Sequence, residues 1–260
     1  ALPILMFLSI LLEVFGQVPI EITNLFSGRF EKTLPYVIFI FGVLVKYYVI
    51  IVLLKWLSNR VNEEKHKPHL NWKSFGYATL MIISFRLIFD NSLIFWVSGI
   101  STPSFINEVV DELAISPIIS IISVIIVAPI YEEIIFRGIL LKGMSKKTNS
   151  AVAIVVSALL FAVVHMNIPQ GINAFLLGLV LGFIYLNKRS IYLSIFAHFI
   201  NNFLALSLSS FFSSIGGEYA IEIHCIFSFV GIILLIIAFD GYKQNKIKNK
   251  PSIYKQFIEV

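Results

Sequence analysis

Residues 116–143 read SPIISIISVIIVAPIYEEIIFRGILLKG, and this stretch decides the fold. It exceeds the roughly 20 apolar residues that a helix needs to cross a bilayer. Because lipid offers no hydrogen-bond partner to backbone amides, a stretch of this kind must form a helix. Glu132, Glu133 and Arg137 interrupt its apolar run. The stretch therefore predicts a membrane-spanning helix that carries charged groups inside the bilayer.

The composition of the whole chain agrees with a membrane protein. Hydrophobic residues make up 58% of the 260 positions and charged residues 13%, with a mean hydropathy of +0.88. A soluble domain carries about a quarter charged residues. The net charge of +5 requires no nucleic-acid partner, because most of it lies in short loops between apolar stretches. Cys225 is the only cysteine, so no internal disulfide can form. We expect one all-α domain over residues 1–260, a polytopic helical bundle embedded in the lipid bilayer.

Apolar stretches separated by Gly, Pro, Ser and Lys predict eight membrane helices. They cover about residues 2–20, 35–57, 75–100, 116–143, 150–166, 170–187, 190–212 and 219–241. Residues 1–20 lack a basic segment and an obvious cleavage site. We therefore expect a first membrane helix there, not a signal peptide.

Basic residues predict the orientation of these helices. They follow the second, fourth, sixth and eighth stretches and include Lys55, Arg60, Lys65, Lys67, Lys73, Lys142, Lys146, Lys147, Lys188, Arg189 and five lysines from Lys243 to Lys255. The alternate loops hold almost none, apart from Arg29 and Lys32. Cytoplasmic loops carry the excess of Lys and Arg, so we expect both termini to lie in the cytoplasm of a multi-pass cell-membrane protein.

Charged residues inside a membrane helix are costly and need a reason. Glu133 and Arg137 lie four residues apart on one helix face and can form an ion pair. Glu132 is rotated by about 100° from Glu133, so it points elsewhere and is the better candidate for chemistry. Pro129 removes a helix hydrogen bond beside the carboxylates and allows a bend.

Two other predicted helices also carry polar residues. Phe161 and His165 are one turn apart in the fifth, and His198 and Asn202 are one turn apart in the seventh, with Asn201 beside them. A carboxylate and a histidine can together activate a water, and a second histidine with an amide can stabilise an oxyanion. A different chemistry is also open, because Glu132, His165 and His198 could instead ligate a metal such as zinc.

Counting residues from the basic loops gives the depth of each group. Glu132 lies ten residues before Lys142, or ~15 Å of helix, and His198 lies nine residues after Arg189, or ~14 Å. These depths agree, and they favour access to the site from the cytoplasm. His165 lies ~24 Å from Asn149. Either its helix is tilted and starts below the membrane surface, or His165 belongs to another place.

The three motifs together resemble a known family. Glu-Glu-x-x-x-Arg at 132–137, Phe-x-x-x-His at 161–165 and His-x-x-x-Asn at 198–202 occur in the order and spacing of the CAAX protease and bacteriocin-processing (CPBP, or Abi) family. This family includes the type II CAAX prenyl endopeptidases. The resemblance covers about residues 115–205, and the sequence up to residue 110 carries no motif of the family.

The resemblance implies an intramembrane endopeptidase with its site in a cavity between helices. Glu132 would be the general base that activates water, assisted by His165, while His198 and Asn202 would stabilise the oxyanion. Glu133 and Arg137, with Phe161, would support the site. The resemblance leaves metal and glutamate mechanisms both open, and the HExxH spacing typical of zinc proteases is absent from this sequence.

Three other features have simpler interpretations. Arg86 and Asp90, four apart in the third predicted helix, are expected to form a buried pair. Gly178 and Gly182 form a GxxxG that lets two helices approach closely. Glu13 has no partner nearby in sequence, and either lines the cavity or lies at a helix end.

Hydrolysis of a peptide or membrane-protein substrate is therefore the leading functional hypothesis. The abundance of Ile, Lys, Asn and Phe resembles proteins from AT-rich bacterial genomes. For a bacterial source, processing of a small secreted or signalling peptide, or bacteriocin self-immunity, is expected in preference to a prenylated substrate. A non-catalytic membrane protein, such as a bacteriocin immunity factor, is the alternative, and a Glu132→Gln substitution separates the two. A proton-coupled carrier is less well supported, because the two halves of the sequence show no internal symmetry.

Overall fold

Helices account for the regular structure throughout the described chain. The computed structural model describes residues 34–58, 70–93, 117–165, 168–215 and 219–245, and no strand occurs among them. The elements are α2 (Leu34–Ser58), α3 (Trp72–Ile88), η1 (Phe89–Leu93), α6 (Pro117–Ile122), η2 (Ser123–Val127), α7 (Ala128–Glu133), η3 (Ile134–Leu141), α8 (Lys142–Met144), α9 (Ser150–Val163), α10 (Ile168–Lys188), α11 (Ile191–Ser213) and α12 (Ala220–Gln244), where η denotes a π-helical segment. The all-α prediction is confirmed.

The helix ends follow from local side-chain chemistry. The Asn71 side chain accepts a hydrogen bond from the Ser74 amide at 2.9 Å and begins α3, and Asn149 accepts one from the Ala151 amide at 2.8 Å and begins α9. Such caps satisfy amides that have no partner within the helix. Arg189 adopts a positive φ of 50° between α10 and α11, which ends one helix and turns the chain into the next.

The helix predicted over residues 116–143 is continuous from α6 to α8, but π-helical segments flank α7 on both sides. Pro129 lies at the start of α7 and has no amide hydrogen to donate. A wider turn before it, in η2, is one way for the chain to pass a missing hydrogen bond. Such turns are frequent at functional sites, and here they flank the two glutamates.

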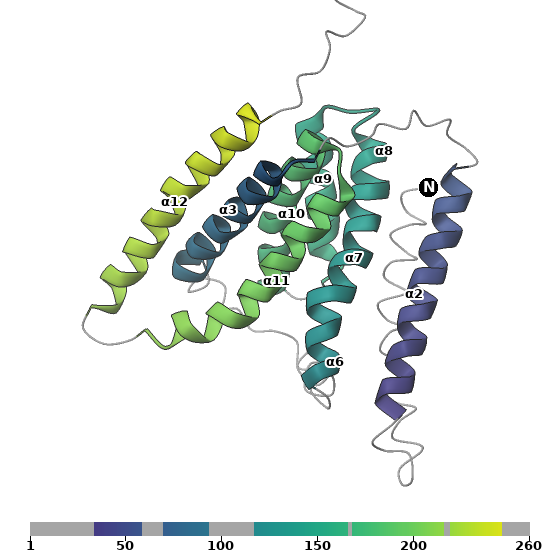
Figure 1. Cartoon of the computed structure of the whole chain (residues 1–260), viewed down its shortest axis with the longest axis horizontal. Helices are drawn as coiled ribbons and strands as arrows, with labels where there is room; N and C mark the ends of the chain where they lie inside the picture. The colour runs from purple at the N-terminus through teal and green to yellow at the C-terminus, as the bar shows by residue number, and fades with distance from the viewer. Residues whose placement is uncertain (1–33, 59–69, 94–116, 166–167, 216–218, 246–260) are drawn as a thin grey trace, which may run out of the picture.

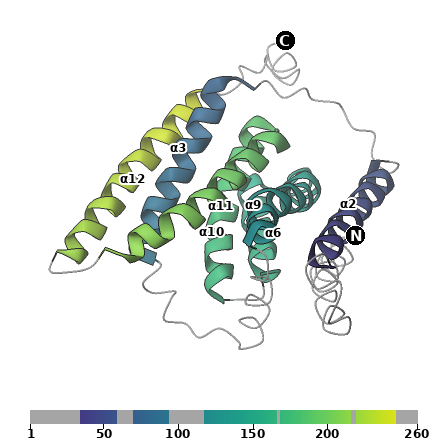
Figure 2. The same ribbon diagram turned by 60° about the horizontal axis from the view of Figure 1, so that its bottom comes forward.

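Close helix contacts hold the bundle together (Figure 1). A Cβ atom on Gly178 would lie 2.9 Å from Cβ of Ala158, and one on Gly182 would lie 3.0 Å from Ile154. The GxxxG pair therefore brings α10 against α9, as predicted. On the other side, α12 lies along α3, where Gly231 faces Leu87 and Ser84. Figure 2 shows α11 lying between the α3–α12 pair and the helices that carry the glutamates.

Four of the helical stretches are long and apolar enough to cross a membrane, namely Ile118–Met144, Ile168–Lys188, Ile191–Leu208 and Ala220–Gln244. Phe39–Val52 and Ser150–Val163 are shorter apolar helices. These helices support a membrane location. The predicted first helix, at 2–20, and residues 94–100 of the third lie outside the described residues, so the total of eight remains a prediction.

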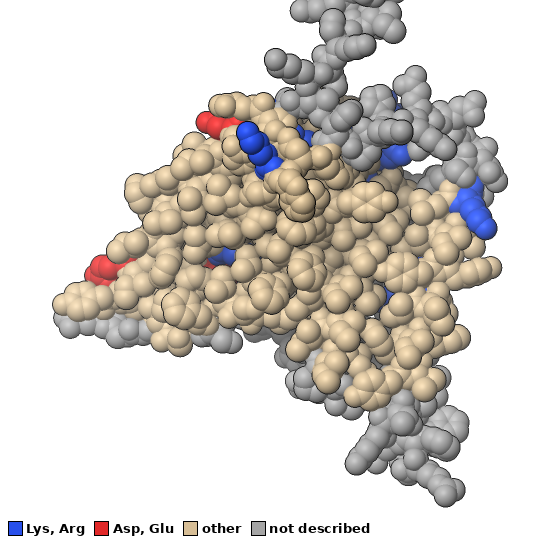
Figure 3. Space-filling model, in the orientation of Figure 1, with Lys and Arg blue, Asp and Glu red and all other residues tan. Residues whose placement is uncertain are grey.

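Basic side chains gather at one end of the described bundle. Lys55, Lys142, Lys188 and Lys243 each lie in the last turn of their helices, α2, α8, α10 and α12. Figure 3 shows Lys and Arg along the upper edge of the molecule, near the ends of α12 and α2. The basic loops that follow every second apolar stretch in the sequence thus lie at one end of the bundle. Which compartment that end faces stays a prediction.

Candidate active site

The ion pair predicted between Glu133 and Arg137 is confirmed. Nη1 of Arg137 lies 2.7 Å from Oε1 of Glu133, and the two side chains are 1% and 0% exposed. Both residues follow the helix period that placed them on one face. The pair lies in the interior of the bundle, where it is shielded from lipid.

Glu133 has further partners on α11. Nδ1 of His198 lies 2.9 Å from its Oε1, and the Ser194 hydroxyl donates to its Oε2. With Arg137, three side chains from two helices contact one carboxylate. Glu133 therefore joins the helix of the first motif to the helix of the third.

Ser194 was missed by the sequence reasoning. It lies four residues before His198, as Asn202 lies four residues after it, so a polar stripe continues along one face of α11. Serine is common in membrane helices and costs little there, which is why it gave no signal. The spacing from His198 was the signal that could have found it.

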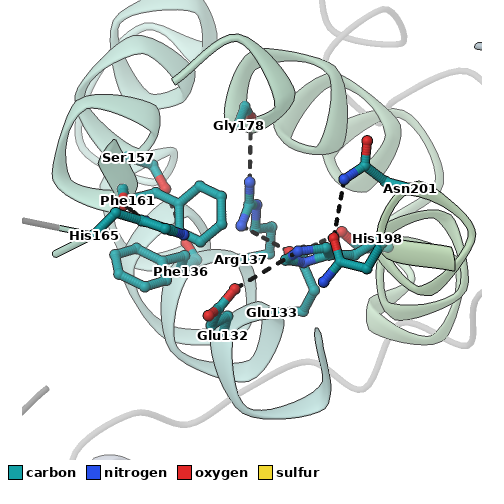
Figure 4. Close-up of polar contacts among 12 residues, drawn as sticks. Glu132, Glu133, Phe136, Arg137, Ser157, Phe161, His165, Gly178, His198 and Asn201 are labelled. Carbon is teal, nitrogen blue, oxygen red and sulfur yellow. Dashed lines mark hydrogen bonds and ion pairs between the residues drawn. The ribbon is translucent and has the colours of Figure 1, made fainter. Parts of the chain in front are cut away.

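Arg137 connects the same cluster to α9 and α10. Its Nη2 lies 3.4 Å from the Gly178 carbonyl oxygen, and its guanidinium lies 4.6 Å from the centre of the Phe161 ring. One turn before Phe161 in α9, the Ser157 hydroxyl donates to the carbonyl of Phe136 in η3 at 3.0 Å. The guanidinium thus braces the helices of the first and second motifs against each other (Figure 4).

Glu132 differs from its neighbour in exposure and in partners. Its side chain is 18% exposed, and its Oε2 lies 3.6 Å from Nε2 of His198. This distance is longer than a good hydrogen bond. Figure 4 shows Glu132 and Glu133 approaching different nitrogens of the same imidazole. Glu132 is therefore the carboxylate that a water or a substrate can reach.

His198 is buried between these two carboxylates, with 3% of its side chain exposed. Because a carboxylate can only accept, Nδ1 must carry the hydrogen that is donated to Glu133. That bond fixes the orientation of the ring and turns Nε2 toward Glu132. Orientation by a carboxylate on the opposite nitrogen is the usual way to position a working histidine.

His165 lies near the site, but on the other side of Phe161. The Phe161 ring meets the His165 ring edge-on at 4.9 Å and the His198 ring at 5.8 Å. Nδ1 of His165 donates to the Phe161 carbonyl at 2.8 Å, so in the neutral ring the lone pair is on Nε2. Residue counting placed His165 farther from the basic end than His198. In the structure both rings contact Phe161 near the end of α9, so the two histidines lie close together.

Asn202 contacts the helix of the first motif. Its Nδ2 donates to the Val124 carbonyl at 2.8 Å, and its Oδ1 accepts from Asn201 at 3.0 Å. Val124 lies in η2, five residues before Pro129, so the amide hydrogen that would close an i→i+5 bond to its carbonyl is missing. One Nδ2 hydrogen remains for another acceptor, since an amide nitrogen carries two.

The residues that the structure describes do not, as placed, bring a set of metal ligands together. No group of three or more His, Cys, Asp or Glu side chains able to hold a metal ion is found among the described residues. Glu132 and His198 approach each other, but His165 is separated from them by the Phe161 ring. As placed, Glu132 and His198 lie close enough to share a ligand, and His165 lies beyond the Phe161 ring.

Comparison with known proteins places the motifs in a family context. Residues 114–204 match the family described as "Type II CAAX prenyl endopeptidase Rce1-like". A Bacillus subtilis (strain 168) protein named "Putative membrane peptidase YdiL" is 33% identical over 129 residues, which cover 49% of this chain and 52% of that protein. The chain thus aligns with about half the length of this relative. No solved structure matches the chain.

These matches confirm the resemblance of the motif-bearing segment to the CAAX protease family. The matched residues 114–204 run from just before α6 into α11 and include all three motifs.

Proposed function

We propose that this protein is a membrane endopeptidase and that Glu132 is the general base that activates the attacking water. The family match and the likeness to a protein named as a membrane peptidase support a membrane protease. The observation that carries the assignment of the base is the contrast between two adjacent glutamates. Glu133 is fully buried and bonded to Arg137, Ser194 and His198, whereas Glu132 is accessible and lies beside His198.

In the proposed reaction, Glu132 takes a proton from water while the water oxygen attacks the carbonyl carbon of the scissile peptide bond. The carbonyl oxygen becomes an oxyanion in the tetrahedral intermediate. Collapse of the intermediate breaks the C–N bond, and Glu132 returns the proton to the leaving amine. His165 is proposed to assist, as the family resemblance implies, from the other side of the Phe161 ring, which packs against both histidines.

His198 and Asn202 are the proposed donors to the oxyanion. With Nδ1–H held by Glu133, a protonated Nε2 of His198 can donate to a substrate oxygen placed beside Glu132, and Asn202 has a second Nδ2 hydrogen. Donors fixed in place before the reaction stabilise the developing charge without reorganisation. Glu133 and Arg137 are positioning residues in this scheme, and Phe161 separates and packs against both histidines.

A peptide or membrane-protein substrate is proposed, with processing of a small secreted or signalling peptide as the best-fitting role. Bacteriocin immunity, the alternative role, requires either the same proteolysis or binding alone. No step of the proposed reaction passes through a metal ion, because the described residues do not form a three-ligand cluster.

The test uses full-length protein in proteoliposomes with a fluorogenic peptide library. Wild type, Glu132→Gln and His198→Ala are compared, each with and without chelator. Glu222→Gln serves as the matched control, because Glu222 is an exposed glutamate in the first turn of α12. We expect cleavage by wild type and by the control, a loss of about 10²–10⁴-fold in Glu132→Gln, and no effect of chelator.

Two results would contradict the proposal. If Glu132→Gln cleaved as fast as wild type, the base would be another group. If wild type cleaved nothing while both wild type and Glu132→Gln protected cells against a bacteriocin, the binding or immunity reading would replace catalysis. Chelator-sensitive cleavage would show that a metal ion takes part.

A further inference from the structure

Lys46 is a cation at the middle of a helix predicted to cross the membrane. It lies 12 residues from each end of α2 (Leu34–Ser58), or ~18 Å along the helix axis. A lysine near a helix end can extend its side chain to the membrane surface, but from this position the four-carbon stem is too short. Apart from Lys55 in its last turn, α2 exposes mainly large hydrophobic side chains, among them Ile40, Phe41, Leu44, Tyr48 and Ile51.

The side chain of Lys46 lies against α7, the helix that carries the two glutamates. Its Nζ lies 5.5 Å from the centre of the Tyr131 ring, and Tyr131 directly precedes Glu132. Ile50, one turn further along α2, is 2% exposed and packs in one cluster with Tyr131, Ile135 and Phe161. The face of α2 that carries Lys46 is therefore the face that packs against α7.

Lys46 also lies at the depth of the proposed catalytic groups. It is nine residues before Lys55, or ~14 Å of helix, at the basic end of the bundle. Glu132 and His198 lie ~15 Å and ~14 Å from their own basic ends, by the same residue count. Three helices thus bring a cation, a carboxylate and an imidazole to one level.

The contacts of Lys46 leave its charge incompletely balanced. A positive charge near the centre of a bilayer is costly, and a cation–π contact with a single tyrosine offsets part of that cost. Across the described segments of the chain, no carboxylate lies at ion-pair distance from Nζ. An anion arriving with the substrate would complete the site.

We propose that Lys46 binds a carboxylate of the peptide substrate and so selects peptides with a negative group close to the scissile bond. This proposal rests on the proposed protease function. The carboxylate is either the C-terminal carboxylate of the peptide or an acidic side chain. A lipid phosphate does not fit, because phosphates lie at the membrane surface, ~18 Å from Lys46 along α2.

The test measures binding, so that it does not depend on cleavage. Fluorescent peptide libraries are added to full-length protein in nanodiscs, in the Glu132→Gln background. One pair of libraries differs only in a free or an amidated C-terminus, and the other differs only in Asp or Asn at one internal position. Lys46→Met removes the charge, Lys46→Arg keeps it, and Lys55→Gln at the end of α2 is the matched control.

We expect the parent protein to bind one carboxylate library about ten- to a hundredfold more tightly than its neutral counterpart, the range for a hydrogen bond to a charged group. The pair that shows the difference identifies the source of the carboxylate. Lys46→Met should abolish the difference, while Lys46→Arg and Lys55→Gln should keep it. In a cleavage assay of the active protein, the same loss should appear in KM and leave kcat little changed.

Equal binding of charged and neutral libraries by the parent protein would overturn the proposal. So would an unchanged preference in Lys46→Met. If instead Glu13→Gln reproduced every effect of Lys46→Met, the lysine would serve as the partner of Glu13, which lies outside the described residues. If the protein preferred the carboxylate libraries but wild type cleaved no peptide, the Lys46 site would be supported and the protease contradicted. The two proposals can therefore fail separately.

Discussion

At the scale of single residues, burial ties the charge of Glu133 to that of Arg137. Removing one member of such a pair leaves the other charged and without its counter-ion, which costs about 3–5 kcal/mol. We expect Arg137→Met to lower the free energy of unfolding by that amount, because Glu133 would keep only Ser194 and His198. Thermal unfolding followed by circular dichroism in detergent measures the loss.

Lys146→Met is the control for the Arg137 prediction, since Lys146 is an exposed cation in the turn after α8. It should leave the unfolding temperature unchanged. The double variant Glu133→Gln/Arg137→Met should be less destabilised than the sum of the single variants, because both charges are removed together. Additive losses would show that the two residues do not act as a pair.

Ser194 supports the same carboxylate from α11. Ser194→Ala removes a hydrogen bond to a charged acceptor, which is worth about 1.5–3 kcal/mol. We expect a loss of stability in this range and a fall in kcat, because His198 shares the Glu133 carboxylate. Ser207→Ala is the matched control, since Ser207 is exposed on the same helix and bonds only to the Phe203 carbonyl. Equal effects of the two substitutions would contradict a special role for Ser194.

Single residues were predictable from sequence where a strong energetic rule applied. The Glu133–Arg137 pair and the Arg86–Asp90 pair followed from charges four residues apart in apolar helices, and both are formed. Ser194 was not predicted, because a serine carries no such penalty. The Val124 partner of Asn202 depends on how two distant helices pack, which residue spacing does not contain.

At the scale of elements, the contact of α10 with α9 depends on the absence of a side chain at Gly178. A methyl group there would lie 2.9 Å and 3.0 Å from two atoms of Ala158. Gly178→Ala should therefore push the helices apart and cost about 1–3 kcal/mol, as overpacking does. It should also lengthen the contact of Arg137 with the Gly178 carbonyl and lower activity. Thermal unfolding and peptide cleavage measure the two effects.

Gly143→Ala is the control for the α9–α10 contact, because a Cβ atom there meets nothing within 4 Å. Alanine also raises helix propensity at both positions, less so at Gly143 near the helix end, so the control accounts for part of that gain. A Gly178→Ala variant as stable as Gly143→Ala would show that the helices can adjust without cost.

Element boundaries were well predicted, because lipid forces every long apolar stretch into a helix. The prediction of 35–57 became Leu34–Ser58, and that of 190–212 became Ile191–Ser213. The π-helical segments around α7 were not predicted beyond a bend at Pro129, since a π turn has no periodic signature in sequence. Nor did counting along a helix reveal how α9 brings His165 to the ring of Phe161.

At the scale of the whole molecule, the described helices place their basic ends together, and the positive-inside rule then predicts that this end faces the cytoplasm.

The single cysteine makes a labelling test simple. In a Cys225→Ser background, one cysteine is introduced at Ser214, after α11, or at Lys146, after α8. Both positions are exposed, and Figure 1 shows the last turns of α11 at the opposite end of the bundle from α8. We expect a membrane-impermeant maleimide to label Ser214→Cys in intact cells and Lys146→Cys only after permeabilisation. The reverse pattern would contradict the predicted orientation. It would also place the Glu132 side chain nearer to the extracellular solution, so that the natural substrates would have to be sought among exported peptides arriving from outside.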